Sequence, residues 1–567
     1  MPSGAREIKR RGVAQTSEQS AIVGIDLGTT NSLIAVVQDR VPRVLDVDGG
    51  PLLPSVVGMD AAGELLVGTA ARNQWVAAPE RTVRSIKRRM GERDYTVALG
   101  DTHHTPEEIS AHILRRLAAR ATPALAGGVR QAVITVPAYF AQHQRQATMR
   151  AGELAGLEVV RLLNEPTAAA LAYGLDRAGA ETVLVYDLGG GTFDVSVVEL
   201  GDGVTEVRAS HGNRQLGGDD FDALILDELA NAFHQRHGVD LRGNRQAMAR
   251  LSRAAEAAKL RLSDHPYATI REEFLAEKDG RPLHLEAELT RSRFEELIAP
   301  LLDGTLEAVR RALRDAELDA RALDAVLLVG GSTRIPAVRD LVAEELGCQP
   351  RQDVHPELAV ALGAAVSGAL AAGVDVGTVL VDVCPHSLGV SAVGLQAGQY
   401  SEDVFVPLIR RNTVIPVSRS EFFYTLTPDQ TAVNVEVYQG EELVASRNTR
   451  LGAVRFEGLS KAPDGGQREV LVAFDYDVNG ILHVAAVDRR TGRKREAHLH
   501  TAALSEVAAT GGEDEVLRQR LERLRGNVPE TAAQRLRGLL ERQVAAGEAA
   551  AWREEAADFL LEYGGEY

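Results

Sequence analysis

The chain has 567 residues, of which 45% are hydrophobic and 25% are charged. This length exceeds what one hydrophobic core supports and predicts three or four domains, while the composition excludes a wholly disordered or collagen-like chain. The 63 basic and 80 acidic residues give a net charge of −17, which argues against a general role on nucleic acid or an anionic membrane. Cys348 and Cys384 are too few for a disulfide framework or a cysteine-based zinc site, so we expect a cytoplasmic location.

The chain begins with a polar stretch. Residues 1–20 contain charged side chains but no apolar core, so they predict a flexible tail rather than a secretory signal. One long uncharged run, Leu358–Val374, is 17 residues of mostly Ala, Gly and Val. This run is short and weakly hydrophobic for a membrane span, and it predicts a buried helix.

A motif at the start of the ordered sequence occurs a second time. Ile25-Asp-Leu-Gly-Thr-Thr is followed by an apolar run, and Tyr186-Asp-Leu-Gly-Gly-Gly-Thr-Phe-Asp is followed by another, 161 residues further on. Each copy predicts two strands joined by a tight loop. The repetition indicates a duplicated, two-lobed α/β domain.

Both loops have the composition of a phosphate site. Glycine and threonine let the backbone approach an anion closely, and Asp26 or Asp187 beside a polyphosphate calls for a divalent cation between them. Mg²⁺, which keeps several waters, is the expected ion, held by these two carboxylates through water. A Walker-type loop and the Gly-x-Gly-x-x-Gly spacing of a dinucleotide site are missing from the sequence. A single copy would favour an ordinary strand turn, but two copies favour a nucleotide clamp.

The texture of the sequence changes after residue 376. The stretch 377–382, Gly-Thr-Val-Leu-Val-Asp, is apolar for a linker and is expected to dock in at least one state. Alternation in Thr431–Tyr438 predicts a strand, and the apolar runs around Asn479-Gly480 in Val470–Val487 predict a hairpin. An antiparallel β domain is therefore expected, followed by two or three short helices interrupted by Pro529, Gly538 and Gly547.

With these residues in view, the chain strongly resembles the seventy-kilodalton heat-shock (DnaK) chaperone family over roughly residues 21–500. The resemblance is carried by the two loops and by further motifs: Val136-Pro-Ala-Tyr-Phe140, Asn164-Glu-Pro-Thr-Ala-Ala-Ala170, Leu216-Gly-Gly-Asp-Asp-Phe-Asp222, Val329-Gly-Gly-Ser-Thr-Arg-Ile-Pro336 and Asp382-Val-Cys-Pro-His-Ser-Leu-Gly389. Among subfamilies it looks most like the short HscC type.

The resemblance implies a multidomain chain. Its parts are a tail at 1–20, an actin-like nucleotide-binding domain at 21–376, a linker at 377–382, a β-sandwich substrate-binding domain at 383–501 and an abbreviated helical lid at 502–567. The implied function is an ATP-dependent chaperone that binds and releases extended hydrophobic peptides of unfolded or client proteins, with ATP/ADP and Mg²⁺ as cofactors and K⁺ as a further ion that the family allows.

Roles carried over from the family fall into three groups. Catalytic roles are implied for Lys87, Glu165, Asp194 and Thr192, around the attacking water, and metal roles for Asp26 and Asp187. Nucleotide contacts are implied for Gly28, Thr29, Thr30, Asn31, Gly189, Gly190, Gly191, Gly217, Gly218, Glu256, Lys259, Ser263, Gly330, Gly331, Ser332 and Arg334. Phosphoryl transfer needs positioning and charge neutralisation, which fits one cation and two carboxylates around a water.

The resemblance also assigns coupling and peptide contacts. Pro137 and Arg145 match a relay from nucleotide to linker, and Arg161, Asn164 and Asp382 match positions where J-domain partners engage. The peptide channel maps onto Val390, Val393, Phe423, Leu426 and Val433, any of which would also serve as sandwich core.

Partners implied are client polypeptides, a J-domain cochaperone and a nucleotide-exchange factor, whose fit is weakened by stretches near 91–106 and 264–290 that are shorter than in DnaK. Nucleic acid and membranes are not expected. Two alternatives stay open: a regulatory binder of one partner that uses ATP as a switch, and a small-molecule kinase on the actin-like fold, against which the β domain argues.

Overall fold

The computed structural model describes residues 22–47, 49–92, 94–125, 128–175, 179–351, 355–374, 376–396, 399–461, 465–497 and 530–541. The chain forms two compact units, 1–501 and 502–567, which are described separately. The predicted tail at 1–20 and most of the predicted lid at 502–567 lie outside the described residues.

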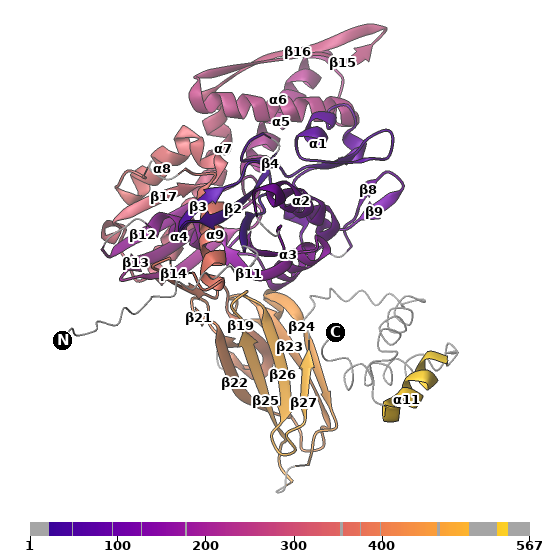
Figure 1. The fold of residues 1–567 in the computed structure, drawn as a ribbon, viewed down its shortest axis with the longest axis vertical. Helices are drawn as coiled ribbons and strands as arrows, with labels where there is room; N and C mark the ends of the chain where they lie inside the picture. Colours follow the sequence, from indigo (N-terminus) through magenta and orange to yellow (C-terminus); the bar gives the residue numbers. More distant parts are fainter. Residues whose placement is uncertain are drawn as a thin grey trace, which may run out of the picture. The chain divides into compact units, whose positions relative to one another are not determined.

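Two sheets with the same local topology form the first part of unit 1 (Figure 1). In one sheet β1 pairs antiparallel with β2 and parallel with β10, and in the other β12 pairs antiparallel with β13 and parallel with β17. The first sheet, in the order β11-β10-β1-β2-β3 with β4 beside β2, comprises Val23–Asp26 (β1), Asn31–Gln38 (β2), Val41–Val44 (β3), Leu53–Pro54 (β4), Gln131–Val136 (β10) and Glu158–Asn164 (β11). The second, in the order β17-β12-β13-β14-β18-β21, comprises Glu181–Leu188 (β12), Phe193–Gly201 (β13), Val204–Asn213 (β14), Ala325–Val329 (β17), Val379–Val383 (β18) and Val414–Ile415 (β21). The duplicated two-lobed α/β arrangement predicted from the repeated motif is therefore confirmed.

Helices α4 (Glu165–Gly174) and α9 (Ala359–Ala371) pack between the two sheets (Figure 1). Their backbones approach closely, because a Cβ added at Gly363 would lie 1.7 Å from the carbonyl oxygen of Ala168. The run Leu358–Val374 thus contains the predicted buried helix. None of the described helices combines the length and apolar character needed to cross a bilayer.

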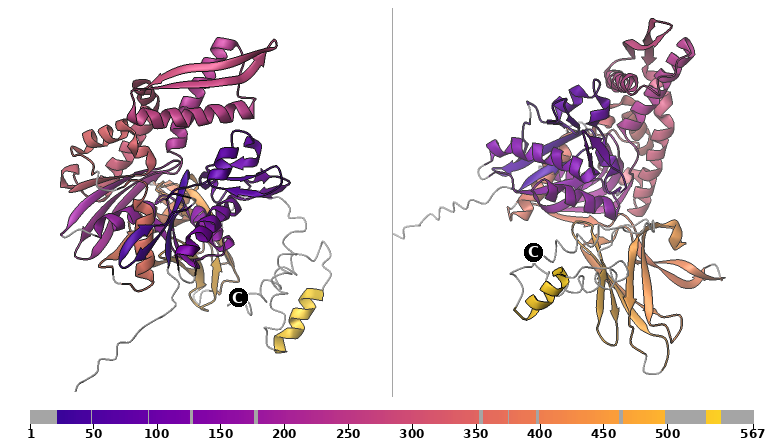
Figure 2. Two further views of the ribbon diagram at one scale, coloured as in Figure 1. Left: turned by 45° about the horizontal axis from the view of Figure 1, so that its top comes forward. Right: turned by 90° about the vertical axis from the view of Figure 1, so that its right-hand side faces the viewer.

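The remaining α-helices of unit 1 cover the outer faces of the two sheets and complete the second lobe, which is the lobe built on the sheet that contains β12. Their bounds are Thr69–Gln74 (α1), Pro106–Ala121 (α2), Gln142–Leu154 (α3), Gly218–His237 (α5), Arg245–Asp264 (α6), Arg291–Asp315 (α7) and Pro336–Leu346 (α8). Small sheets add Val57–Met59 (β5), Leu65–Val67 (β6), Thr82–Val83 (β7), Val97–Leu99 (β8), Thr102–His104 (β9), Tyr267–Lys278 (β15) and Arg281–Thr290 (β16). The β15–β16 hairpin extends beyond α5 and α6 (Figure 2).

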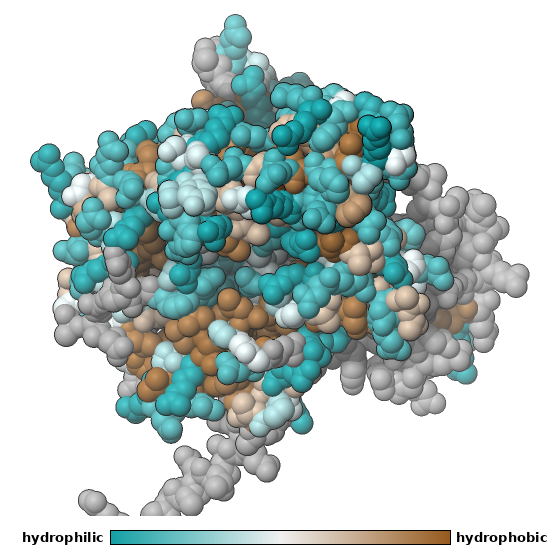
Figure 3. Space-filling model, turned by 90° about the horizontal axis from the view of Figure 1, so that it is seen from above, coloured by the Kyte–Doolittle hydropathy of each residue, from teal (hydrophilic) through white to brown (hydrophobic). Residues whose placement is uncertain are grey.

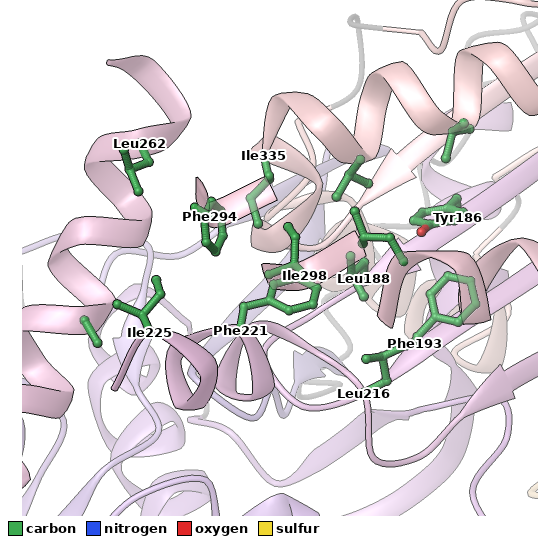
Figure 4. Close-up of a cluster of buried hydrophobic side chains, with 14 of the residues drawn as sticks. Tyr186, Leu188, Phe193, Leu216, Phe221, Ile225, Leu262, Phe294, Ile298 and Ile335 are labelled. Atoms are coloured by element: carbon green, nitrogen blue, oxygen red, sulfur yellow. The ribbon is translucent and has the colours of Figure 1, made fainter. Parts of the chain in front are cut away.

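The core of the second lobe includes side chains from β12, β13, α5, α6 and α7 (Figure 4). Tyr186 and Phe193 lie with ring centroids 4.7 Å apart, and the Tyr186 hydroxyl donates to Thr305 Oγ1 at 2.7 Å. The packed lobe gives the loop after β12 a rigid base.

Hydrophilic side chains dominate the face shown in Figure 3, with hydrophobic residues gathered in the lower centre of the view.

The described residues from 388 to 497 form a β-sandwich. One sheet has the order β20-β19-β23-β24 and the other β22-β25-β26-β27. The strands are Leu388–Gln396 (β19), Gln399–Ile409 (β20), Val417–Tyr424 (β22), Ala432–Gln439 (β23), Thr449–Glu457 (β24), Glu469–Tyr476 (β25), Leu482–Asp488 (β26) and Lys494–Ala497 (β27). The strand predicted at 431–438 and the hairpin predicted around Asn479-Gly480 are confirmed as β23 and β25–β26.

The apolar stretch before the sandwich is itself a strand. β18 pairs in parallel with β14, with Val379 opposite Val204, and antiparallel with β21, with Asp382 opposite Ile415. Val381 and its neighbours thereby extend the sheet of the second lobe. The docking expected from the apolar composition is present in this structure.

Unit 2 is described only by α11, Glu530–Glu541. Leu536 and Leu539 are buried. This helix runs through Gly538, so the predicted interruption there is wrong. An isolated glycine costs a helix about 1 kcal/mol, which an amphipathic face can offset.

Candidate functional site

A cleft of about 610 Å³ lies between the two lobes. Both repeated loops open into it, together with the loop after β17 and one face of α6. Of the residues expected at a nucleotide site, the cleft is lined by Asp26, Gly28, Thr29, Thr30, Asn31, Lys87, Glu165, Asp187, Gly189, Gly190, Thr192, Gly218, Glu256, Lys259, Ser263, Gly330, Gly331, Ser332 and Arg334. Residues more than 300 positions apart in the sequence therefore meet at one concave surface.

Glycines at the cleft occupy positions where a side chain has no room. A Cβ added at Gly190 would lie 2.0 Å from Thr30 Oγ1, so the Gly190 backbone of one repeated loop packs directly against a threonine side chain of the other. Gly330 has φ +85°, and a Cβ there would lie 2.3 Å from the carbonyl oxygen of Leu188. Such close backbone packing creates the cradle of N–H groups that binds phosphate in proteins.

Three of the expected residues do not line the cleft directly. Gly217 packs against Gly190, since a Cβ at Gly217 would lie 2.5 Å from the Gly190 carbonyl carbon, and Gly191 lies against Thr29. The Asp194 carboxylate is 1% exposed and accepts a hydrogen bond from the Tyr139 backbone N–H at 3.0 Å. Gly217 and Gly191 shape the loops from behind, while Asp194 lies behind the cleft wall.

Four carboxyl groups lie around the single ammonium group of Lys87: those of Asp26, Glu165 and Asp187 at the base of the cleft, and that of Asp194 behind its wall. Lys87 and Glu165 are buried and form an ion pair, and Thr135 Oγ1 donates to Asp26 Oδ1 at 3.2 Å. Burial and the neighbouring Glu165 raise the pKa of Asp26 to about 7 and that of Asp194 to about 8. Burial, then Glu165, Asp194 and Asp26, also raises the pKa of Asp187 well above its ordinary value.

This cluster carries more acidic groups than its lysine can neutralise, so it fits a bound cation. Among the described residues, no three His, Cys, Asp or Glu side chains stand close enough together to ligate a metal ion directly. The arrangement fits a cation whose ligands are water and phosphate, with Asp26 and Asp187 in the surrounding shell. The residues present therefore suit Mg²⁺ with a polyphosphate.

The opposite side of the cleft is built on α6. Glu256, Lys259 and Ser263, spaced about one and two helical turns apart, lie on its cleft-facing side, as the family resemblance implies. Lys259 Nζ donates to the Gly218 carbonyl oxygen at 3.0 Å and to Asp222 Oδ2 at 2.8 Å. Burial raises the pKa of Asp222 to about 6, an effect that the adjacent Lys259 opposes.

Two ion pairs join the lobes on either side of Lys87. Arg84 Nη2 lies 2.9 Å from Glu256 Oε2, and Arg88 Nη2 lies 3.0 Å from Asp220 Oδ1. Arg84 precedes the short 3₁₀ helix Ile86–Arg89 and Arg88 lies within it; Ser85, directly before the helix, has a left-handed conformation with φ 53°. Neither ion pair was predicted, because each joins residues more than 130 positions apart with no local sequence signal.

A chain of hydrogen bonds leads from the cleft to β18. Asp194 holds the Tyr139 N–H, and the adjacent Ala138 carbonyl oxygen accepts from Arg145 Nη2 at 3.1 Å. The same guanidinium nitrogen donates to Asn164 Oδ1 at 2.6 Å. Asn164 Nδ2 in turn donates to Asp382 Oδ2 at 3.0 Å.

The predicted coupling residues lie at or beside this chain. Pro137 precedes the 138–139 segment at the end of β10. The Arg161 guanidinium faces Asp382, where its charge opposes the effect of burial, which raises the pKa of that carboxyl. Arg145 Nη1 also donates to the Asn479 carbonyl oxygen at 3.3 Å, which brings the sandwich into the same network.

The predicted peptide-channel residues do not share one environment. Val390 is 1% exposed and belongs to the sandwich core, with Phe423 and Val433 packed at the edge of the same cluster. Leu426 is 58% exposed, and Val393 is half-buried on β19. Three of the five therefore contribute to sandwich packing, and Leu426 offers apolar surface.

A nucleotide cleft in a two-lobed domain, joined by hydrogen bonds and a docked strand to a β-sandwich, defines a class of nucleotide-driven two-domain proteins. A family model described as Hsp70 protein matches residues 22–523. The chaperone protein DnaK of Thermotoga neapolitana is 48% identical over 482 residues, which is 84% of this chain and 79% of that protein. DnaK of Thermotoga maritima is 48% identical over the same shares.

The chain belongs to the Hsp70 family. It is an ATP-dependent molecular chaperone that hydrolyses ATP. The finer likeness to the short HscC type stays a prediction.

Proposed function

We propose that ATP binds in the interlobe cleft with its phosphates between the two repeated loops. The observation that carries this proposal is the glycine cradle, in which Gly190 leaves only backbone opposite Thr30. Thr29, Thr30 and the Gly189–Thr192 loop would hold the phosphates, and the α6 face with the 330–334 segment would hold the adenosine.

Lys87, Glu165 and Asp194 are suited to orient the attacking water, with the Thr192 hydroxyl beside them. The ion pair between Lys87 and Glu165 fixes both side chains in a buried setting, where electrostatic interactions are strong. Asp194, whose pKa is raised by burial, is suited to accept a proton from that water. Mg²⁺, held through water by Asp26 and Asp187, would neutralise charge on the transferring phosphate.

Nucleotide state would be transmitted to the sandwich through Pro137, Arg145 and Asn164 to Asp382. A shift of Asp194 moves the Tyr139 N–H and the neighbouring Ala138 carbonyl, on which the Arg145 position depends. Undocking of β18 would break the bond from Asn164 to Asp382. ATP would favour the docked linker and weak peptide binding, and ADP the free linker and tight binding.

The sandwich would bind extended apolar peptides of unfolded or client proteins along Val393, Phe423, Leu426 and Val433, with Val390 supporting the channel from the core. A J-domain cochaperone would engage near Arg161, Asn164 and Asp382, and a nucleotide-exchange factor at the second lobe. We place this activity in the cytoplasm. Family membership favours this reading over a small-molecule kinase.

Single-turnover hydrolysis tests the assignment of the catalytic group. Lys87→Ala and Asp194→Ala should slow phosphate release by about a hundredfold or more, since each removes a group that positions the nucleophile. Unchanged rates in both variants would contradict it. Pull-down in ADP against ATP then separates a general chaperone, which should retain many unfolded proteins, from a regulator of one partner.

A further inference from the structure

Two histidines lie where the sandwich meets the ATPase lobes. His386 follows the linker strand, and its ring centroid lies 4.1 Å from that of Tyr139, in the segment between β10 and α3. His386 Nε2 lies 3.3 Å from the Tyr139 carbonyl oxygen, to which it can donate. This contact joins the sandwich to the residue whose N–H holds Asp194.

The surroundings of His386 disfavour a positive charge. His211 faces it from β14, Arg214 from just after that strand and Arg145 from α3. Tyr139 covers its ring, and the Cys384 thiol donates to its carbonyl oxygen at 2.9 Å. The nearby carboxylate of Glu441 accepts bonds from the Ser387 N–H at 2.8 Å and the Ser387 hydroxyl at 2.9 Å. Burial, reinforced by the arginines, lowers the pKa of His386 from 6.5 to about 3.

The second histidine shares one carboxylate with the sandwich. His211 Nε2 lies 2.7 Å from Asp315 Oδ2, and Arg411 Nη2, from the sandwich, lies 2.7 Å from Asp315 Oδ1. Asn412 Nδ2 adds a bond to Asp315 at 3.3 Å. Burial lowers the pKa of His211, against the pull of Asp315, and the charges of Arg411 and Arg311 lower it further.

We propose that this interface is an acid-sensitive latch, in which protonation of His386 and His211 releases the sandwich and linker from the ATPase lobes. A proton on His386 would be buried against arginines, and a proton on His211 would place a second positive charge beside Arg411 on the Asp315 carboxylate. Both effects weaken the docked form. The inference rests on the proposed function, in which undocking tightens the grip on peptide, so acidification would make the chaperone hold clients even with ATP bound.

The direction and size of the pH effect on docking follow from the pKa of His386 in the docked and undocked forms. Once released into water, its pKa returns to 6.5, so the undocked form binds a proton over a pH range in which the docked form does not. The contribution of neutral His386 to docking is therefore fully present above pH ~7 and is progressively lost as pH falls below 6.5. The ratio of docked to undocked protein should fall about tenfold between pH 7.5 and 5.5 from this histidine alone.

The test measures docking directly on the full chain. The Thr192→Ala background is chosen because loss of the hydroxyl beside the attacking water should slow hydrolysis. Small-angle scattering with saturating Mg²⁺ and ATP gives the radius of gyration at pH 7.5 and 5.5. Wild-type latch residues should give a compact particle at pH 7.5 that expands at pH 5.5. The double variant His386→Leu/His211→Gln should stay compact at both values, and His265→Gln, which changes an exposed histidine, should expand like the parent.

Two outcomes overturn the latch and leave the proposed function intact. In the first, ATP compacts the parent protein at pH 7.5 but the protein does not expand at pH 5.5. In the second, the double variant expands at pH 5.5 as much as the parent. Failure of ATP to compact the protein at pH 7.5 contradicts the proposed function, and the latch falls with it. If leucine at position 386 prevents docking at pH 7.5, His386→Gln, which retains a donor for the Tyr139 carbonyl, replaces it and must also resist acid.

Discussion

Asn164→Ala removes the side chain that joins Arg145 to the linker. The buried Asn164 amide accepts from Arg145 at 2.6 Å and donates to Asp382 at 3.0 Å. The bond to Asp382 exists only while β18 is docked, so its loss falls on the docked state alone. A hydrogen bond to a charged group contributes about 1.5–3 kcal/mol, which corresponds to a ten- to hundredfold shift of the docking equilibrium.

Hydrogen exchange of the linker amides and ATP-induced peptide release report this shift. In Asn164→Ala with ATP, amides of residues 379–383 should exchange faster and a bound fluorescent peptide should dissociate more slowly than in the wild type. Thr167→Val is the matched control, because its hydroxyl lies 3.4 Å from the same Asp382 oxygen and its loss should cost less. Wild-type exchange and release in Asn164→Ala would refute the role of this bond.

Three further predictions concern the cleft. Asp194→Asn should slow single-turnover hydrolysis by about 10²- to 10⁴-fold while ATP affinity stays within a few-fold, and a rate near wild type would remove Asp194 from the mechanism. Arg84→Ala should speed ADP dissociation, measured by stopped flow, by about 1.5- to 5-fold, because it deletes a partly exposed ion pair with Glu256 that joins the lobes. Arg89→Ala is the control: it breaks an exposed ion pair with Glu92 inside one lobe and should leave the dissociation rate unchanged. In the folded nucleotide-free protein the pKa of Asp26 is raised from 3.8 to about 7 and that of Asp194 to about 8. Near neutral pH these carboxyls therefore hold protons that the unfolded chain has lost. The stability that they contribute is lost as pH rises through 7 to 8. Thermal midpoints without nucleotide should accordingly fall between pH 6 and 8.5, less steeply in Asp194→Asn, and equal slopes in both proteins would contradict this assignment.

Features encoded in short stretches of sequence could be predicted. The loops at Asp26 and Asp187 were recognisable because glycine and threonine follow an apolar run in both copies, and the strands on either side of each loop are as expected. The hairpin at Asn479-Gly480 was likewise visible from its turn residues. Its loop is longer than a two-residue turn, since Asp477 N–H bonds to the Ile481 carbonyl oxygen at 3.0 Å.

Features that depend on tertiary contacts could not be predicted. Nothing near Asn479 in the sequence indicates that its side chain accepts from the Leu162 N–H at 3.0 Å, 317 positions away. The contact of Arg411 with Asp315 likewise joins a sandwich loop to the end of α7. Such pairs become neighbours only when β18 brings the sandwich against the lobes, an arrangement that no local pattern specifies.

ATP-triggered release of a bound peptide tests the central claim most directly. A fluorescent extended apolar peptide is bound in ADP, and its dissociation is followed after mixing with Mg²⁺ and either ATP or ADP. The coupling of cleft, linker and sandwich predicts that the peptide dissociates at least tenfold faster in ATP than in ADP. A tenfold ratio corresponds to the free energy of about one hydrogen bond to a charged group. Equal dissociation rates in ATP and ADP would contradict it.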